Sequence, residues 1–168
     1  PDYDKTAVRF NGTSALATAP ERVKKWKNPE GGYFHAMHSH DWGDFHYRIT
    51  GKNEKGELQL EGGWQNNRPM GIHPENRMVE NIFEELDAPG EWYYDKQEGW
   101  LYYYPLSDEN INELVFETPQ LKNLIEIAGT SSHPVKNITI EGIELTQTIR
   151  TFMEHYEPLL RSDWTIYR

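Results

Sequence analysis

Apolar and polar residues alternate over several short stretches in the first part of the chain. The stretches begin at Tyr33, Phe45 and Leu58, and a period of two is typical of β strands that bury one face. The polar loop at 51–56 separates the second stretch from the third, which predicts a hairpin with a long connection. On the first strand, the alternation places four residues on one face: Phe34, Ala36, His38 and His40.

Two other stretches have helical features. Residues 18–26 begin with Thr18 as a candidate cap, followed by Pro20 and an acidic residue in the first turn, which predicts a short helix. Residues 78–86 carry apolar side chains at helical spacing and end before the turn at 87–90, so we expect a second short helix there.

The segments 91–95 and 100–104 are rich in Trp and Tyr and flank a four-residue turn that contains Gly99. Aromatic residues favour strands, so this pattern predicts a β hairpin. Alternation along the strands turns about half of these rings inward, into the core of this part of the chain. Only the outward half is available to a ligand.

After Pro119 the pattern changes to short β-branched runs, at 124–127 and 137–145, separated by turns of small residues. Alternate inward Ile and Val residues are typical of a solenoid, in which each coil buries its face only against its neighbours. The strand-like residues 163–168 carry no terminating turn or polar cap. We therefore expect the coils to continue in a longer parent protein.

Composition narrows the range of partners. Aromatic residues make up 13% of the chain, and aromatic faces suit either a sheet core or a sugar ring. The formal net charge of -10 disfavours nucleic acid and anionic membrane surfaces. The chain has no Cys, which excludes thiol nucleophiles and thiolate metal sites, and it has no phosphate-binding loop or Gly-x-Ser-x-Gly motif.

Four stretches resemble large bacterial right-handed parallel β-helix proteins related to glycoside hydrolases. The most specific is ENIFEELDAPGEWYYDKQEGWLYYYP, from Glu80 to Pro105. In those proteins a similar run belongs to a small β-rich lobe inserted near the start of the helix, and a segment similar to PVKNITIEGIELTQT resumes the coils. The stretches HSHDWGDFHYRITG and LEGGWQNNRPMG are also similar, so the resemblance covers nearly the whole chain.

The resemblance implies a mainly β fold, with an inserted aromatic β-rich lobe at 1–118 that includes one or two short helices, and the first parallel β-helix coils at 119–168. It also implies an extracytoplasmic, polysaccharide-active protein, a glycoside hydrolase, in which this chain supplies a substrate-side lobe and an incomplete catalytic centre. Expected partners are an oligo- or polysaccharide and the remainder of the parent chain. Nucleic acid, membrane insertion and a cofactor are not expected. The alternative is a non-catalytic carbohydrate-binding or structural module.

Histidine and aspartate residues cluster between positions 35 and 46. A metal site is one interpretation, but no spacing matches a strong zinc signature, so no metal is predicted. A second interpretation is a glycan site, in which an aromatic ring stacks on a sugar and polar groups bind its hydroxyls. A third is packing with internally paired polar atoms. The candidate sugar-binding residues from this region are His38, His40, Trp42, Asp44 and His46, to which we add Trp64.

The segment 150–161 interrupts the coil pattern with mixed charges, as a loop leaving a solenoid does. It adds four candidate sugar-binding residues: Arg150, His155, Glu157 and Arg161. A salt-bridged structural loop explains these residues equally well. The acidic residues between 84 and 95 are expected to be solvated or to cap turns, because abundance alone does not provide a pair of carboxylates across a scissile bond.

Overall fold

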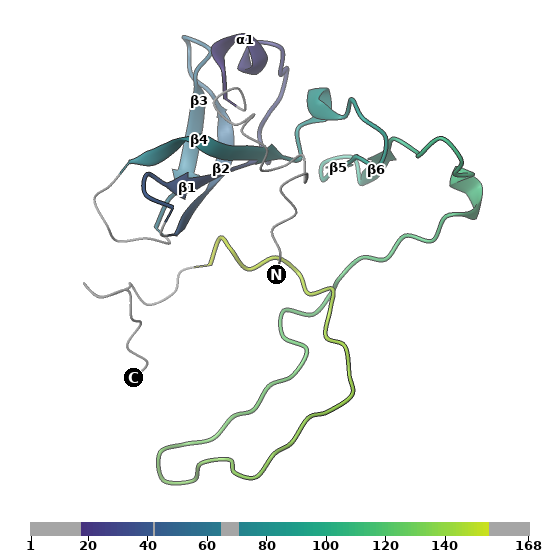
Figure 1. The fold of residues 1–168 in the computed structure, drawn as a ribbon. Helices are drawn as coiled ribbons and strands as arrows, with labels where there is room; N and C mark the ends of the chain where they lie inside the picture. Colours follow the sequence, from purple (N-terminus) through teal and green to yellow (C-terminus); the bar gives the residue numbers. More distant parts are fainter. Residues whose placement is uncertain (1–17, 42, 65–70, 155–168) are drawn as a thin grey trace. The chain divides into compact units, whose positions relative to one another are not determined.

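The computed structural model describes residues 18–41, 43–64 and 71–154, and it is mainly β. A four-stranded antiparallel sheet has the order β3-β2-β1-β4 (Figure 1). Its strands are β1 (Tyr33–His38), β2 (Asp44–Lys52), β3 (Leu58–Gly62) and β4 (Ile72–Glu80). A separate two-stranded sheet pairs β5 (Trp92–Asp95) with β6 (Trp100–Tyr103). The helical elements are short: α1 (Pro20–Val23), η3 (Phe83–Glu85) and η4 (Ile111–Glu113).

One face of the four-stranded sheet carries the hydrophobic core. Phe34, Ala36 and Ile49 project from β1 and β2 and pack with Val23, Trp26 and Ile82. Trp26 and Ile49 are fully buried. Because side chains alternate along a strand, the intervening residues of β1 and β2 lie on the opposite face of the sheet.

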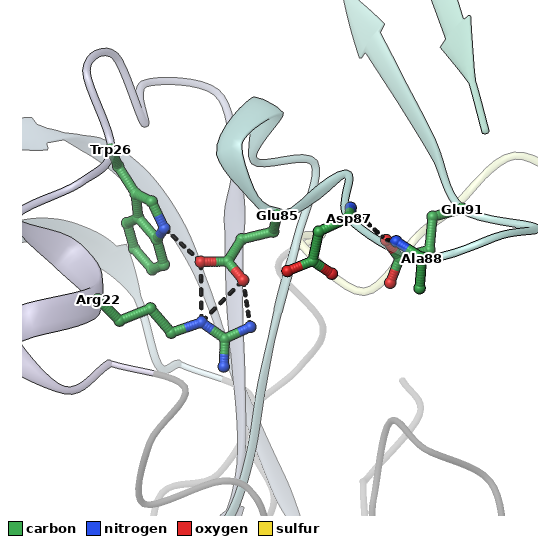
Figure 2. A network of polar contacts seen from close by, with 6 residues as sticks. All are labelled: Arg22, Trp26, Glu85, Asp87, Ala88 and Glu91. Carbon is green, nitrogen blue, oxygen red and sulfur yellow. Dashed lines mark hydrogen bonds and ion pairs between the residues drawn. The ribbon is translucent and has the colours of Figure 1, made fainter.

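An ion pair ties α1 to η3 beside this core. The Arg22 guanidinium donates hydrogen bonds from Nε to both oxygens of Glu85, at 2.8 Å each, and a further bond from its terminal nitrogen. Trp26 donates its indole N–H to Glu85 Oε1 at 2.5 Å (Figure 2). Glu85 therefore connects two elements that are far apart in sequence.

The short helix at the start of the described chain is confirmed, but its predicted cap is wrong. The helix begins at Pro20, and its N-cap is Ala19, which makes no side-chain hydrogen bond. Proline at the first position supplies the fixed backbone angle and needs no N–H partner, so this end does not require a Thr18 side chain.

The expected helix at 78–86 is wrong. The strand β4 extends to Glu80, and Val79 pairs with Phe34 of β1. Only the single 3-10 turn Phe83–Glu85 follows. Pairing of residues 77–80 with β1 satisfies the backbone as a strand, and it prevails over the helical spacing of a few apolar residues.

The expected strands at 33, 45 and 58 and the aromatic hairpin are confirmed. In the hairpin, Trp92 pairs with Tyr103 and Asp95 pairs with Trp100. Asn81 attaches this hairpin to the end of β4: it accepts a hydrogen bond from Tyr94 N–H at 2.9 Å and donates to the Tyr94 carbonyl at 3.2 Å. His40 lies beyond the end of β1 and is exposed, so it does not share the face of Phe34 as predicted.

The chain separates into two units, of which the second is Leu114–Thr151. No strand is assigned in this unit, and the strands expected at 124–127 and 137–145 are not formed (Figure 1). The unit closes through a hydrogen bond from Ile149 N–H to the Leu121 carbonyl at 3.0 Å. Its branched apolar side chains are exposed, as for Ile138 at 53% and Ile143 at 58%. Residues 152–154 group with the first unit.

Within the described ranges, no helix has the length and apolar character needed to cross a membrane.

Candidate functional site

A cavity of about 230 Å³ lies on the sheet face opposite the core. Residues of three strands line it, together with Phe152, which belongs to the first unit although it follows the second unit in sequence. The strands contribute the following residues: His35, Ala36 and Met37 from β1, Asp44 and His46 from β2, and Asn76, Arg77, Met78 and Glu80 from β4.

Two histidines form the centre of this site. His35 and His46 are directly opposite each other in the β1–β2 ladder. Their Nδ1 atoms are 2.6 Å apart, so one imidazole donates a hydrogen bond to the other. The sheet register therefore fixes the contact, because neighbouring strands place opposite side chains on the same face at close range.

A carboxylate lies at the outer end of each imidazole. His35 Nε2 is 3.1 Å from Glu80 Oε2, and His46 Nε2 is 3.1 Å from Asp44 Oδ2. The four groups form a chain in the order Glu80, His35, His46 and Asp44. With both carboxylates ionised, these three contacts require three hydrogens on the four ring nitrogens, one more than two neutral imidazoles carry.

The two carboxylates differ in their environment. The hydrogen bond from His46 lowers the pKa of the Asp44 carboxyl below its ordinary value of 3.8, although partial burial acts in the opposite direction. The side chains of Asp44 and Glu80 are 57% and 39% exposed, whereas those of His46 and His35 are 17% and 11% exposed. The carboxylates are therefore accessible, and the imidazoles between them are largely covered.

Phe152 supplies an aromatic surface over the histidine pair. Its ring centroid is 4.9 Å from those of both His35 and His46 and 5.3 Å from that of Tyr33. The contacts with His35 and Tyr33 are edge-to-face, at interplanar angles of 81° and 89°. Aromatic rings prefer this geometry, and it holds Phe152 in a defined position beside the cavity.

The structure brings together two of the predicted sugar-binding residues, Asp44 and His46. Trp64 is half-buried and does not line the cavity. Arg150 belongs to the second unit and is exposed. Four further candidates lie outside the described residues: Trp42, His155, Glu157 and Arg161.

The predicted sugar-binding residues His38 and His40 lie away from the cavity. His38 is fully buried on the core face, and its Nδ1 accepts a hydrogen bond from His40 N–H at 3.1 Å. The Nε2 atom of His38 has no hydrogen-bond partner among the described residues. The imidazole of His40 is exposed and bonds the Ser39 hydroxyl at 2.9 Å. Neither histidine lines the cavity.

The predicted sugar-binding set omits three residues of the site: His35, Glu80 and Phe152. Alternation in the sequence carried a signal for the first, since His35 lies on the β1 face that does not contain Phe34 and Ala36. Glu80 could not be placed there while residues 78–86 were expected to be helical. Nothing in the local pattern connects Phe152 to His46, more than a hundred residues earlier.

Four of the acidic residues between 84 and 95 have structural partners. Glu84 accepts a hydrogen bond from Lys27 N–H at 2.8 Å, and Glu85 binds Arg22 and Trp26. Glu91 accepts from the N–H groups of residues 87 and 88, at 2.9 Å each (Figure 2). Asp95 accepts from the N–H groups of residues 97 and 98. These carboxylates stabilise turns and element contacts.

Comparison with known proteins adds no assignment: no family model, no curated protein and no solved structure matches this chain.

Proposed function

We propose that the sheet lobe of this chain binds an oligo- or polysaccharide in the cavity beside His35 and His46. The lobe would be the substrate-side part of an extracytoplasmic, polysaccharide-active β-helix protein of the glycoside hydrolase kind. The observation that carries the proposal is the combination in one cavity of two accessible carboxylates, Asp44 and Glu80, with an aromatic ring, Phe152.

The chemistry of the cavity suits a sugar. Carboxylates accept hydrogen bonds from sugar hydroxyls, and an aromatic ring packs against the apolar face of a pyranose. At about 230 Å³ the cavity is smaller than the roughly 300–1,000 Å³ typical of drug-sized ligands, which favours one ring or a chain end.

A binding role suits this lobe better than a complete catalytic role. Four of the acidic residues between 84 and 95 are occupied in turns or in contacts of η3 with Arg22 and Lys27. In the proposed parent protein, the general acid and its partner carboxylate would belong to β-helix coils outside this lobe. The same structural use of the carboxylates also favours the second candidate function, a non-catalytic carbohydrate-binding module.

The second unit supports the β-helix part of the proposal. Alternate residues such as Ile138 and Ile140 are apolar, yet they are 53% and 47% exposed. Apolar residues at this spacing are stabilised when neighbouring coils cover them, and a solenoid coil alone cannot bury its own face. The proposal predicts that further coils cover these side chains in the parent protein.

Titration of the chain with neutral and acidic plant cell-wall oligosaccharides, followed by calorimetry and product analysis, tests the function. We expect saturable binding without bond cleavage. Replacing both carboxylates, by Asp44→Asn and Glu80→Gln, should weaken binding by about 10-fold or more, since each is worth roughly 0.5–1.5 kcal/mol as a hydrogen-bond acceptor.

Glu61→Gln is the matched control. It removes one negative charge from the same sheet. Glu61 forms an ion pair with Arg48 at 2.5 Å, and neither residue lines the cavity. Binding should be unchanged in this variant. No binding of any oligosaccharide would refute the carbohydrate role, and turnover by the chain alone would refute the division between binding lobe and catalytic coils.

A further inference from the structure

We propose that the facing Nδ1 atoms of His35 and His46 form a binding site for a divalent transition metal ion of the zinc class. The site is independent of carbohydrate binding, because it uses the ring nitrogens between the carboxylates and requires no sugar. Two imidazoles on opposite positions of neighbouring antiparallel strands are its protein ligands.

The outer contacts of the pair are those of metal-binding histidines. A metal-bound imidazole commonly donates its second N–H to a carboxylate, which fixes the tautomer and orients the ring. Both imidazoles here have a carboxylate at Nε2, Glu80 for His35 and Asp44 for His46, at 3.1 Å in each case. This arrangement leaves the two Nδ1 atoms directed toward each other.

Two Nδ1 lone pairs cannot face each other at 2.6 Å without a cation between them. A shared hydrogen satisfies the pair at this separation. A zinc ion bound at about 2.0–2.1 Å to each nitrogen requires the nitrogens to be about 3.3 Å apart in tetrahedral geometry. The rings must therefore separate by less than about 1 Å, and zinc replaces the shared hydrogen.

The cavity provides room for the remaining ligands. The described residues contain no group of three or more His, Asp or Glu side chains placed to hold a metal, so this part of the chain supplies two ligands. Water, or a group of a bound ligand, would complete the coordination from the cavity, which adjoins both imidazoles. Such an open position is typical of metal sites that bind or activate a ligand.

Calorimetric titration of the metal-free chain with zinc chloride in two buffers of different ionisation enthalpy tests this site. We expect one saturable zinc site, with release of the shared hydrogen to the buffer on binding. His46→Gln should weaken binding by about 10-fold or more, and Glu80→Ala by about 10- to 100-fold through loss of the acceptor that orients His35.

Two histidines outside the site are matched controls. His73 lies 3.8 Å from the Asp41 carboxylate, and its Nδ1 accepts hydrogen bonds from the N–H groups of residues 75 and 76, whereas His133 is exposed in the second unit. His73→Gln and His133→Gln should leave zinc affinity unchanged. Circular dichroism of each variant establishes that the sheet is folded. Nitrogen NMR of the imidazoles in the unaltered chain should show zinc on Nδ1 of two residues, which needs no variant.

Three results would overturn the site: absence of saturable zinc binding, equal zinc affinity in His46→Gln, or NMR shifts that place zinc on other histidines. None of these results bears on the oligosaccharide titration in the absence of zinc.

Discussion

Glu85 contributes to the fold through two hydrogen-bonding partners, Arg22 in α1 and Trp26 just after it. Its carboxylate accepts from the Arg22 guanidinium and from the indole of Trp26, which is fully buried. Burial of the Glu85 carboxyl acts to raise its pKa, but the hydrogen bonds from Arg22 and Trp26 outweigh burial, and the pKa is lowered from 4.5. The ionised form is therefore the one that the folded state stabilises.

Replacing Glu85 should separate the effects of charge and hydrogen bonding. We expect Glu85→Ala to lower the free energy of unfolding by about 2–3 kcal/mol, because it leaves the buried Trp26 N–H without its acceptor. Glu85→Gln should cost about 1 kcal/mol, since an amide oxygen still accepts from Trp26 and the Arg22 side chain is partly exposed. Urea unfolding followed by Trp fluorescence measures both. Equal losses in the two variants would contradict this role of the indole hydrogen bond.

The same residue gives a pH dependence with a definite sign. The folded-state pKa of Glu85 is lowered, so its stabilisation is present above the ordinary value of 4.5 and is lost as the pH falls through the lower folded-state value. The difference in unfolding free energy between the unaltered chain and Glu85→Gln should therefore be largest near neutral pH and shrink on acidification below about pH 4.5. A difference that grows in acid would show that the ion pair has the opposite linkage.

At the scale of elements, two residues with positive φ lie where strands of the sheet end. Gly62 at the end of β3 has φ of +142°, and a Cβ there would lie 2.3 Å from the His46 carbonyl oxygen. Asn81 after β4 has φ of +55°, which Asn tolerates better than most residues. Gly62 pairs with β2, which carries His46, and Asn81 forms hydrogen bonds with Tyr94 of β5.

Gly62→Ala should destabilise the first unit by about 2 kcal/mol or more, because both the positive φ and the backbone contact oppose a side chain. The displaced backbone is that of His46, so the zinc affinity proposed for the His35–His46 pair should also fall. Gly56→Ala is the control: its φ is +79° and its Cβ would meet nothing within 4 Å, so it reports backbone strain alone. Thermal unfolding compares the two, and equal destabilisation would show that the contact with His46 is unimportant.

Asn81 should be tested with two replacements. Asn81→Gly keeps the backbone free to adopt positive φ but removes both hydrogen bonds to Tyr94, whereas Asn81→Ala removes the bonds and adds strain. We expect losses of about 1 kcal/mol for Gly and about 2 kcal/mol for Ala. Hydrogen exchange of β5 and β6 should accelerate in both variants. Unchanged exchange would mean that the hairpin is held by other contacts.

The sequence predicted elements well where one period dominated. Alternation located β1, β2 and β3, and the aromatic runs located the β5–β6 hairpin. The prediction failed at β4. Val79 and Ile82 have helical spacing, which led to a helix being expected, but pairing with β1 makes this segment a strand. The site was predicted in part for the same reason: Asp44 and His46 are local, but Glu80 and Phe152 reach the cavity only through tertiary structure.

At the scale of the whole molecule, the two units differ in how their backbones are satisfied. In the first unit, β1 forms ladders with both β2 and β4, and the ladder with β4 shifts its register between Ala36 and His38. The second unit, Leu114–Thr151, has no strand ladder and contains local contacts such as the reciprocal hydrogen bonds between Thr130 and His133. Few backbone hydrogen bonds and exposed apolar side chains are the features of segments with low local stability.

This difference predicts that the units respond separately to exchange and to protease. Amides of residues 122–148 should exchange with solvent far faster than those of β1 and β2, and limited proteolysis should cut first within Leu114–Thr151. Ile138→Thr together with Ile143→Thr should leave the melting temperature of the sheet unchanged and reduce self-association, because both side chains are more than half exposed. Sedimentation measures the association. Slow exchange throughout 122–148 in the isolated chain would instead show that the coil strands form without neighbouring coils, which would contradict the proposal that such neighbours are needed to cover Ile138 and Ile143.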